Sequence, residues 1–232
     1  MAKERVTVCV PRCDPGDVPR AIGTVMAPYD YNRVFAPGEP VVETWWDYWR
    51  IDGRGCEFPV VPGHEDDPRL IRGTGTPSGL CAGGPRGLLD LETPRARAAA
   101  EARRAFETWQ EFASGYPPAR PMSHFWSRYV ADPEHYPQAR ALEDFRTQPA
   151  IAALMERPDL EDLVGGDPVA HLGNDLDTHV RDAANAALPT PALLTLEGHW
   201  LSVAGPEGDR HFNDYLDTLP PDAIVVRVLY HG

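Results

Sequence analysis

The densest group of chemically useful side chains lies in residues 45–54 (WWDYWRIDGR), where four aromatic residues accompany two arginines. Trp46, Tyr48 and Trp49 offer planar faces, while Arg50 and Arg54 carry guanidinium groups suited to binding anions. Together they predict a stacking platform for a small planar anionic ligand such as a nucleotide. The same aromatic residues would also serve as anchors in the core of a sheet, and both interpretations stay open.

A second polar group is the acidic run 64-HEDD-67, which lies in a loop rich in glycine and proline. His64, Glu65 and Asp66 are candidate metal ligands, because imidazole and carboxylate suit hard or borderline divalent ions. Adjacent residues cannot all reach one ion, so a distant histidine would have to complete the site. The alternative is an ordinary solvated acidic loop.

His231 stands at the end of the last predicted strand, and histidines at strand ends can serve as acid–base groups. With His64 and Asp66 it forms the candidate catalytic set of a small metal-dependent or acid–base hydrolase. Its possible carboxylate partners, if the two terminal strands pair, are Asp14, Asp47 and Asp52. Trp200, on a predicted hairpin, is a candidate wall of the aromatic site.

The usual catalytic signatures are absent from the sequence. It contains no Walker loop, no G-x-G-x-x-G after a strand, no H-E-x-x-H and no G-x-S-x-G. The sequence therefore specifies no cofactor and leaves open whether the protein is an enzyme.

Charge and hydropathy narrow the classes of partner. The net charge is −13, from 35 acidic and 22 basic residues, and no segment of the sequence forms a basic patch. We therefore expect no nucleic-acid binding. No apolar run approaches 18 residues and no signal peptide is recognisable, so we expect a cytoplasmic protein with no membrane contact. Four cysteines do not suggest a disulfide scaffold, although a zinc site remains an alternative.

The pattern of elements predicts an α+β fold. Strands are expected at residues 5–10, 41–51, 192–196, 199–204 and 223–230, and helices at 17–27 and 207–219. The order β-α-β … β-β-α-β predicts a small ferredoxin-like sheet formed from both chain ends. The near-continuous apolar run at 223–230 is typical of a central strand.

Between these ends the sequence predicts a long, mostly helical insertion. Its clearest helix begins after Thr93 and ends before Gly115, with Pro94 in the first helical position. We expect a single domain with a core at 1–60 and 190–232, a loop-rich segment at 53–92 and the insertion at 90–189. Neither chain end alone would bury its strands.

Several segments resemble a family of uncharacterised proteins from actinobacterial phages and actinomycete genomes. They are MAPYD at 26–30, the W-D-Y-W-R-I-x-G-R stretch, and a closing helix followed by L-P-x-D and a terminal strand. The chain departs from the family pattern at Asp52, where the family has Gly, and at Gly55, where it has Trp. Leu229 and Tyr230 replace Asp and Cys, while His231 is kept. The resemblance implies a phage or mobile-element setting and no particular activity.

Two hypotheses follow from these observations. In the first, the chain is a non-catalytic accessory protein that binds a small ligand or a host protein through the aromatic and arginine residues. In the second, it is a small hydrolase that uses loop histidines and carboxylates.

Overall fold

The computed structural model describes residues 3–73, 75–173, 175–202 and 205–232. The chain forms two compact units, one comprising 1–95 and 185–232 and the other 96–184. The helical insertion predicted from the sequence, at 90–189, extends beyond the second unit at both ends. None of the helices within the described residues is long and apolar enough to cross a membrane.

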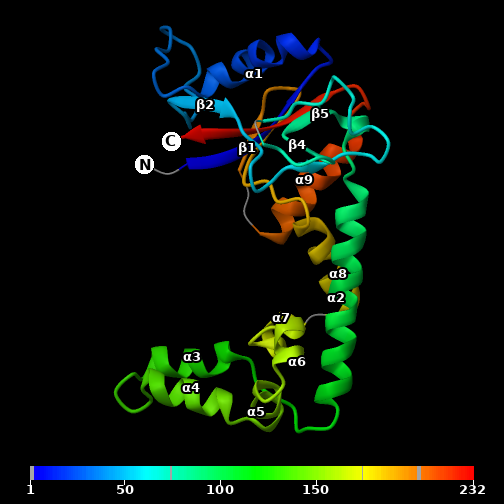
Figure 1. Ribbon diagram of the computed structural model, residues 1–232. Helices are drawn as coiled ribbons and strands as arrows, with labels where there is room; N and C mark the ends of the chain where they lie inside the picture. Colours follow the sequence, from blue (N-terminus) through cyan, green and yellow to red (C-terminus); the bar gives the residue numbers. More distant parts are fainter. Residues whose placement is uncertain (1–2, 74, 174, 203–204) are drawn as a thin grey trace. The chain divides into compact units, whose positions relative to one another are not determined.

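The first unit contains a mixed sheet with strands from both chain ends (Figure 1). Its path runs β2-β8-β1-β6-β7, and β5 pairs with β8 beside it. The strands are β1 (Lys3–Val10), β2 (Tyr48–Ile51), β5 (Gly83–Pro85), β6 (Leu193–Leu194), β7 (Trp200–Leu201) and β8 (Ile224–His231). β1 pairs antiparallel with β8 along its whole length and parallel with β6. The predicted end of the hairpin strand, at 203–204, lies outside the described residues.

Helix α1 (Val18–Met26) covers one face of this sheet and α9 (Pro206–Thr218) the other (Figure 1). α1 buries Val18, Ile22 and Met26, which recur every four residues on one side of the helix. The fold is thus a mixed arrangement of helices and sheet, as predicted at that level. The ferredoxin-like arrangement is not confirmed, because the two helices lie on opposite faces rather than on one.

The predicted strand at 41–51 is shorter in the structure, since only Tyr48–Ile51 form β2. Trp46 is held instead as an isolated bridge partner of Asp30, and its indole nitrogen donates to the Met26 carbonyl at 3.0 Å. Trp45 and Trp46 pack in the core beneath α1 and Val41 is exposed, so the apolar character of this segment does not indicate a longer strand. The loop-rich segment that follows contains a two-stranded sheet of β3 (Phe58–Pro59) and β4 (Leu80–Cys81).

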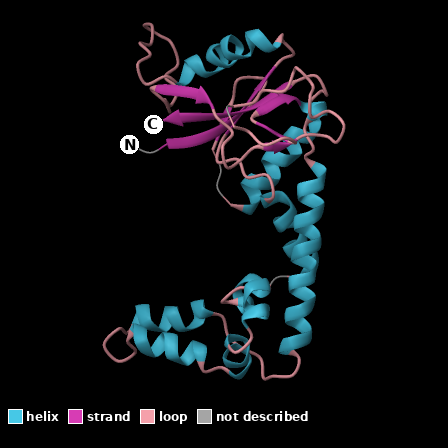
Figure 2. Ribbon diagram, viewed as in Figure 1, coloured by secondary structure: helices cyan, strands magenta, loops and turns pink. Residues whose placement is uncertain are grey.

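The second unit consists of helices joined by loops, with no strand among its described residues (Figure 2). It contains most of α2 (Glu92–Ala113) and of α8 (Leu176–Ala186), which both continue into the first unit. Between them lie α3 (Met122–Ala131), α4 (Gln138–Arg146), α5 (Pro149–Met155), α6 (Pro158–Val164) and α7 (Pro168–His171). Trp109, Phe125, Phe145 and Ile151 belong to its separate hydrophobic core.

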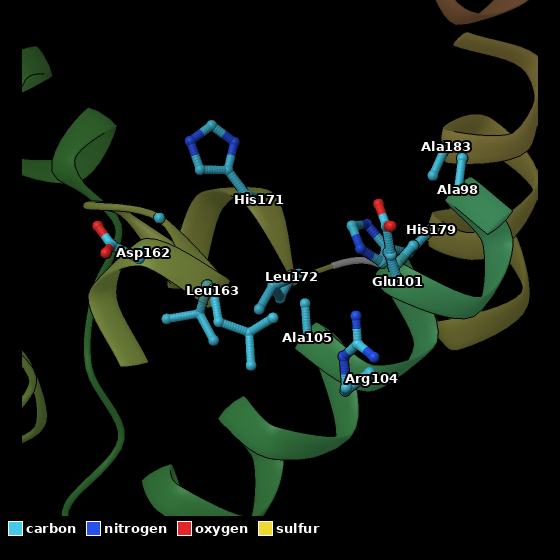
Figure 3. A pocket seen from close by; sticks show the side chains of 13 residues that line it. Ala98, Glu101, Arg104, Ala105, Asp162, Leu163, His171, Leu172, His179 and Ala183 are labelled. Carbon is cyan, nitrogen blue, oxygen red and sulfur yellow. The ribbon is translucent and has the colours of Figure 1, made fainter. Parts of the chain in front are cut away.

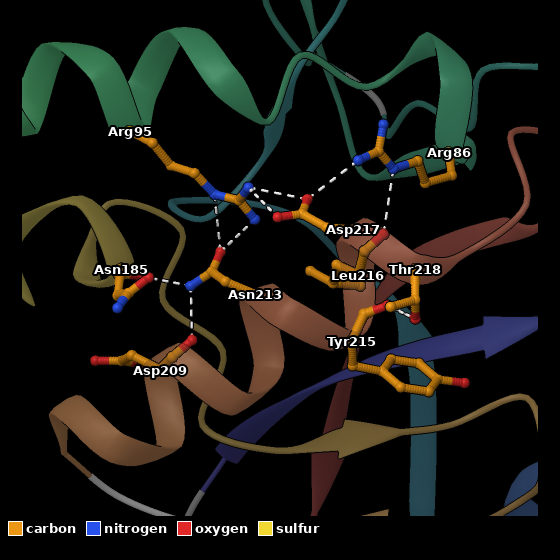
Figure 4. Close-up of polar contacts among 9 residues, drawn as sticks. All are labelled: Arg86, Arg95, Asn185, Asp209, Asn213, Tyr215, Leu216, Asp217 and Thr218. Atoms are coloured by element: carbon orange, nitrogen blue, oxygen red, sulfur yellow. Dashed lines mark hydrogen bonds and ion pairs between the residues drawn. The ribbon is translucent and has the colours of Figure 1, made fainter. Parts of the chain in front are cut away.

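A polar network on α9 binds Arg95 and Asn185, the residues at which the chain leaves and re-enters the first unit (Figure 4). Arg95, at the root of α2, donates to Asn213 Oδ1 and pairs with Asp217 at 2.8 Å. The Asn213 amide nitrogen donates to the carbonyls of Asn185 and Asp209. One buried asparagine therefore joins residue 95 to residue 185, although they are separated by the whole insertion.

Candidate functional site

Strand pairing brings side chains from three distant segments onto one face of the sheet. Trp49 and Ile51 pack with the core beneath α1, as do Val6, Val8 and Val228. Because side chains alternate along a strand, the intervening residues point to the opposite face. They form three rows across β1, β8 and β2: Lys3 with His231 and Tyr48, Arg5 with Leu229 and Arg50, and Thr7 with Arg227 and Asp52.

This face gathers five bases in a chain that is strongly acidic as a whole, with Asp52 between two of them, Asp47 beside His231 and Glu57 near Arg54. We call Lys3, Arg5, Arg50, Arg54 and Arg227 the basic face. Arg54 lies in the turn after β2, and its carbonyl accepts a hydrogen bond from Arg5 Nη2 at 2.6 Å. No segment of the linear sequence forms a basic patch, so this grouping was not predicted. The patch is invisible in the linear sequence because its members are separated by up to 224 residues and meet only through strand register.

Asp52 is an acid of the basic face, and it binds both arginines of the predicted anion site. Its Oδ2 atom lies 2.7 Å from Arg50 Nη2 and 2.9 Å from Arg54 Nη2. The hydrogen bonds from Arg54, followed by that from Arg50, hold the pKa of the Asp52 carboxyl far below its ordinary value. One carboxylate thus fixes two guanidinium groups and leaves one positive charge in excess.

Arg5 and Arg227 have no carboxylate within ion-pair distance among the described residues. Arg227 is 2% exposed, donates from Nε to the Cys56 carbonyl, and stacks its guanidinium on Phe58 at 4.3 Å. Burial lowers the pKa of Arg227, as does the nearby charge of Arg5. Arg5 Nε is buried and has no hydrogen-bond partner. Unpaired buried cations are costly, and a bound anion would lower that cost.

Two hollows flank Arg50. The smaller, of about 60 Å³, is lined by Lys3, Tyr48, Arg50 and His231 together with the strand residues between them. The larger, of about 270 Å³, lies between the turn after β2 and a neighbouring loop. Its lining residues are Arg50, Ile51, Asp52, Gly53, Arg54, Gly73, Thr76 and Ala82. A ligand at Arg50 would have space on either side of the guanidinium.

The predicted aromatic cluster is divided between the two faces of the sheet. Tyr48 lies on the basic face and is 61% exposed. Trp46 and Trp49 pack in the core beneath α1. Trp200 stacks on Trp45, with ring centres 6.0 Å apart, and also contacts that core. Of the predicted ligand-binding residues, the structure brings together Tyr48, Arg50 and Arg54, whereas Trp46, Trp49 and Trp200 act as sheet anchors.

His231 has a carboxylate partner at the border of the basic face. Its Nδ1 atom lies 2.7 Å from Asp47 Oδ1, and the Asp47 backbone nitrogen donates to the His231 carbonyl at 3.0 Å. An ionised carboxylate only accepts hydrogen bonds, so Nδ1 donates and Nε2 is left for another partner. Asp47 was one of three predicted partners, and it is the one that strand pairing selects.

The acidic loop gives the predicted metal site no ligand set. Glu65 accepts from the Gly63 backbone nitrogen, and Asp67 is held by Arg69 at 2.7 Å. Within the described residues, no three His, Cys, Asp or Glu side chains are grouped so as to hold a metal ion. Metal binding by His64, Glu65 and Asp66 therefore stays a prediction, without a preassembled site. The four cysteines are free thiols.

The helical unit contains a larger, open hollow of about 640 Å³ between α2, the segment at 162–172 and α8 (Figure 3). Its floor is apolar, with Ala102, Ala105 and Leu172 among its residues. His171 lies on one side of it, and Glu101, Arg104 and His179 lie on the other (Figure 3). These polar groups do not converge on one point, so the basic face is the stronger candidate.

Comparison with known proteins adds no family: no family model, curated protein or solved structure matches the chain.

Proposed function

We propose that the basic face binds a small planar anionic ligand, with a nucleotide as the best chemical match. The observation that carries the proposal is that strand register brings Lys3, Arg5, Arg50, Arg54 and Arg227 onto one face of the sheet, where Asp52 pairs with only two of them. The chain as a whole, whose net charge is −13, has the opposite sign to the basic face. An anionic ligand supplies the counter-charge that the chain does not.

The two parts of a nucleotide match different features of the face. The exposed ring of Tyr48 offers a stacking surface for a base, and aromatic stacking of this kind tolerates any base. The hollow of about 60 Å³ beside Lys3 and Arg50 is too small for a ring, and the charges of Lys3 and Arg50 in its lining could hold phosphate oxygens at its mouth. The larger hollow beside Arg54 offers space for a second anionic group.

Calorimetric titration of AMP and of adenosine into the purified protein tests this proposal. We expect AMP to bind and adenosine to bind at least tenfold more weakly, because only AMP carries the anion. R50A is expected to raise the Kd of AMP by about 10- to 100-fold, since a charge-assisted hydrogen bond contributes roughly 1.5–3 kcal/mol.

The matched control is R20A. Arg20 lies on α1, over the opposite face of the sheet, and it is paired with Asp17 as Arg50 is paired with Asp52. R20A is expected to leave the Kd unchanged. Absence of AMP binding to the unmodified protein, or equal losses in R20A and R50A, would show that the basic face is not the site.

A second candidate function, acid–base hydrolysis, is favoured by one observation, the hydrogen-bonded pair of Asp47 and His231. The pair borders the hollow that would hold the anion. The metal-dependent form of this function has no comparable support. A setting as an accessory protein of a phage or mobile element stays a prediction.

A further inference from the structure

The pair of Asp47 and His231 is built as a positioned acid–base group. His231 is anchored by strand pairing to Lys3 on one side and Tyr48 on the other. Its side chain is 21% exposed, and its Nδ1 atom is occupied by Asp47. A carboxylate on Nδ1 fixes the ring orientation and stabilises the imidazolium that forms when Nε2 accepts a proton.

Among the described residues that line the hollow with His231, two carry charge but none is a serine, threonine or cysteine. Lys3, Tyr48 and Arg50 line the same hollow as His231, with Leu229 and Tyr230 completing the lining. The cations would stabilise charge that develops on a phosphoryl group. The simplest reaction for these side chains is therefore one in which the substrate itself carries the nucleophile. A ribose 2′-hydroxyl next to a phosphodiester is such a group, and its attack gains from being intramolecular.

We propose that the basic face cleaves RNA-type phosphodiesters, with His231 as the general base and Asp47 as its positioning residue. The ribose O2′ attacks phosphorus, and its proton passes to His231 Nε2. The O2′–P bond forms as the P–O5′ bond breaks, and the departing O5′ takes a proton from the Lys3 ammonium group. Solvent then carries a proton from His231 back to Lys3. The products are a 2′,3′-cyclic phosphate and a 5′-hydroxyl, so no oxidant, reductant or further reactant is consumed.

This inference rests on the proposed binding of a nucleotide by the same face, and it names the substrate class. The expectation against nucleic acid rested on net charge and on the lack of a linear basic patch. The basic face supplies the positive charge that the linear sequence lacks. The negative net charge opposes the binding of long polymers more than that of short ones. A dinucleotide or a short single strand is accordingly the expected substrate.

The test compares a short single-stranded RNA with a DNA of the same base sequence, both in EDTA. We expect RNA to be cleaved to ends that bear a 2′,3′-cyclic phosphate, identified by mass spectrometry. DNA should bind with a similar Kd and remain intact, because it lacks the 2′-hydroxyl. H231A should lower kcat by about 10²- to 10⁴-fold, the usual range for a general base, with the Kd changed less than threefold.

Two further variants separate chemistry from folding and from contaminating nuclease. D47N should lower kcat and alter its pH profile while KM stays unchanged, which loss of folded protein would not produce. R20A, purified in the same way, should cleave as the unmodified protein does.

The possible failures can be told apart. Binding of AMP without cleavage of RNA by the unmodified protein would overturn this inference and leave the proposed function standing. Absence of AMP binding would overturn both. Equal cleavage by H231A and the unmodified protein would assign the activity to another source and overturn the role of His231.

Discussion

At the scale of single residues, Asp52 has two opposed effects. Its hydrogen bonds with Arg50 and Arg54 stabilise the fold, while its charge competes with any anion for the same guanidinium groups. We therefore expect D52N to lower the free energy of unfolding at pH 7 and to tighten AMP binding. A gain of about fivefold corresponds to roughly 1 kcal/mol, the solvent-exposed interaction of two charges at 4 Å. Urea unfolding and calorimetry measure the two effects separately.

The pH dependence of the D52N effect follows from the lowered pKa of Asp52. A carboxyl with a lower pKa in the folded state stabilises the protein above its unfolded value, near 3.9, and this contribution is lost as the pH falls below it. The stability difference between D52N and the unmodified protein should therefore shrink between about pH 4 and pH 2. A difference that stays constant over this range would show that Asp52 is not stabilised as a carboxylate.

Arg227 provides a second prediction at this scale. It is a buried cation with no carboxylate partner among the described residues, so its desolvation is only partly offset. R227M, which removes the charge but keeps the length, should leave the free energy of unfolding within about 1 kcal/mol of the original. R227A should cost roughly 2–4 kcal/mol because it leaves a cavity. Equal losses in both variants would mean that the charge itself stabilises the fold.

At the scale of elements, sequence patterns predicted the elements whose residues form a continuous local signal. The apolar run at 223–230 predicted the central strand β8, and Pro94 with Gly115 predicted α2. Patterns failed where a contact between distant segments decided the outcome. Trp45 and Trp46 have strand-like character, but the packing of Trp46 beneath α1 keeps them outside β2.

The same limit explains how much of the candidate site was predictable. Arg50 and Arg54 stand out within one stretch, so their role in an anion site was predicted from sequence. Lys3, Arg5 and Arg227 were not predicted as members of this site. Their side chains can be placed on the same face as Arg50 only when the register of β1, β8 and β2 is known. The alternation of apolar residues within β1 indicates which of its side chains share a face. No local feature of the sequence indicates that β2 pairs with β8.

Asn213 carries the prediction that belongs to this scale. It accepts from Arg95, and it donates to the carbonyls of Asn185 and Asp209. N213A leaves buried polar groups without partners, so it should lower the free energy of unfolding by about 2–3 kcal/mol. D214A is the matched control, since Asp214 is the next residue on α9 and is exposed. Equal and small effects of both variants would show that the network contributes little.

At the scale of the whole molecule, a chain of charge −13 carries a basic face on one of its two units. The negative field of the remaining surface opposes the approach of an anion at long range, whereas the basic face attracts it at short range. Added salt screens both, but it acts on exposed contacts such as those of Arg50 and Arg54 most strongly. We expect the Kd of AMP to rise about tenfold between 0.05 M and 0.5 M salt. A Kd that does not change with salt would indicate apolar binding at another site.

The most direct measurement of the central claim is a map of amide chemical shifts during titration with AMP. Our account predicts that the largest changes fall on Tyr48, Arg50, Leu229 and His231, in the rows that β2 and β8 share. The amides of α1 and of the helical unit should change little. Changes confined to the helical unit, or changes spread evenly over the chain, would contradict the assignment of the basic face as the binding site.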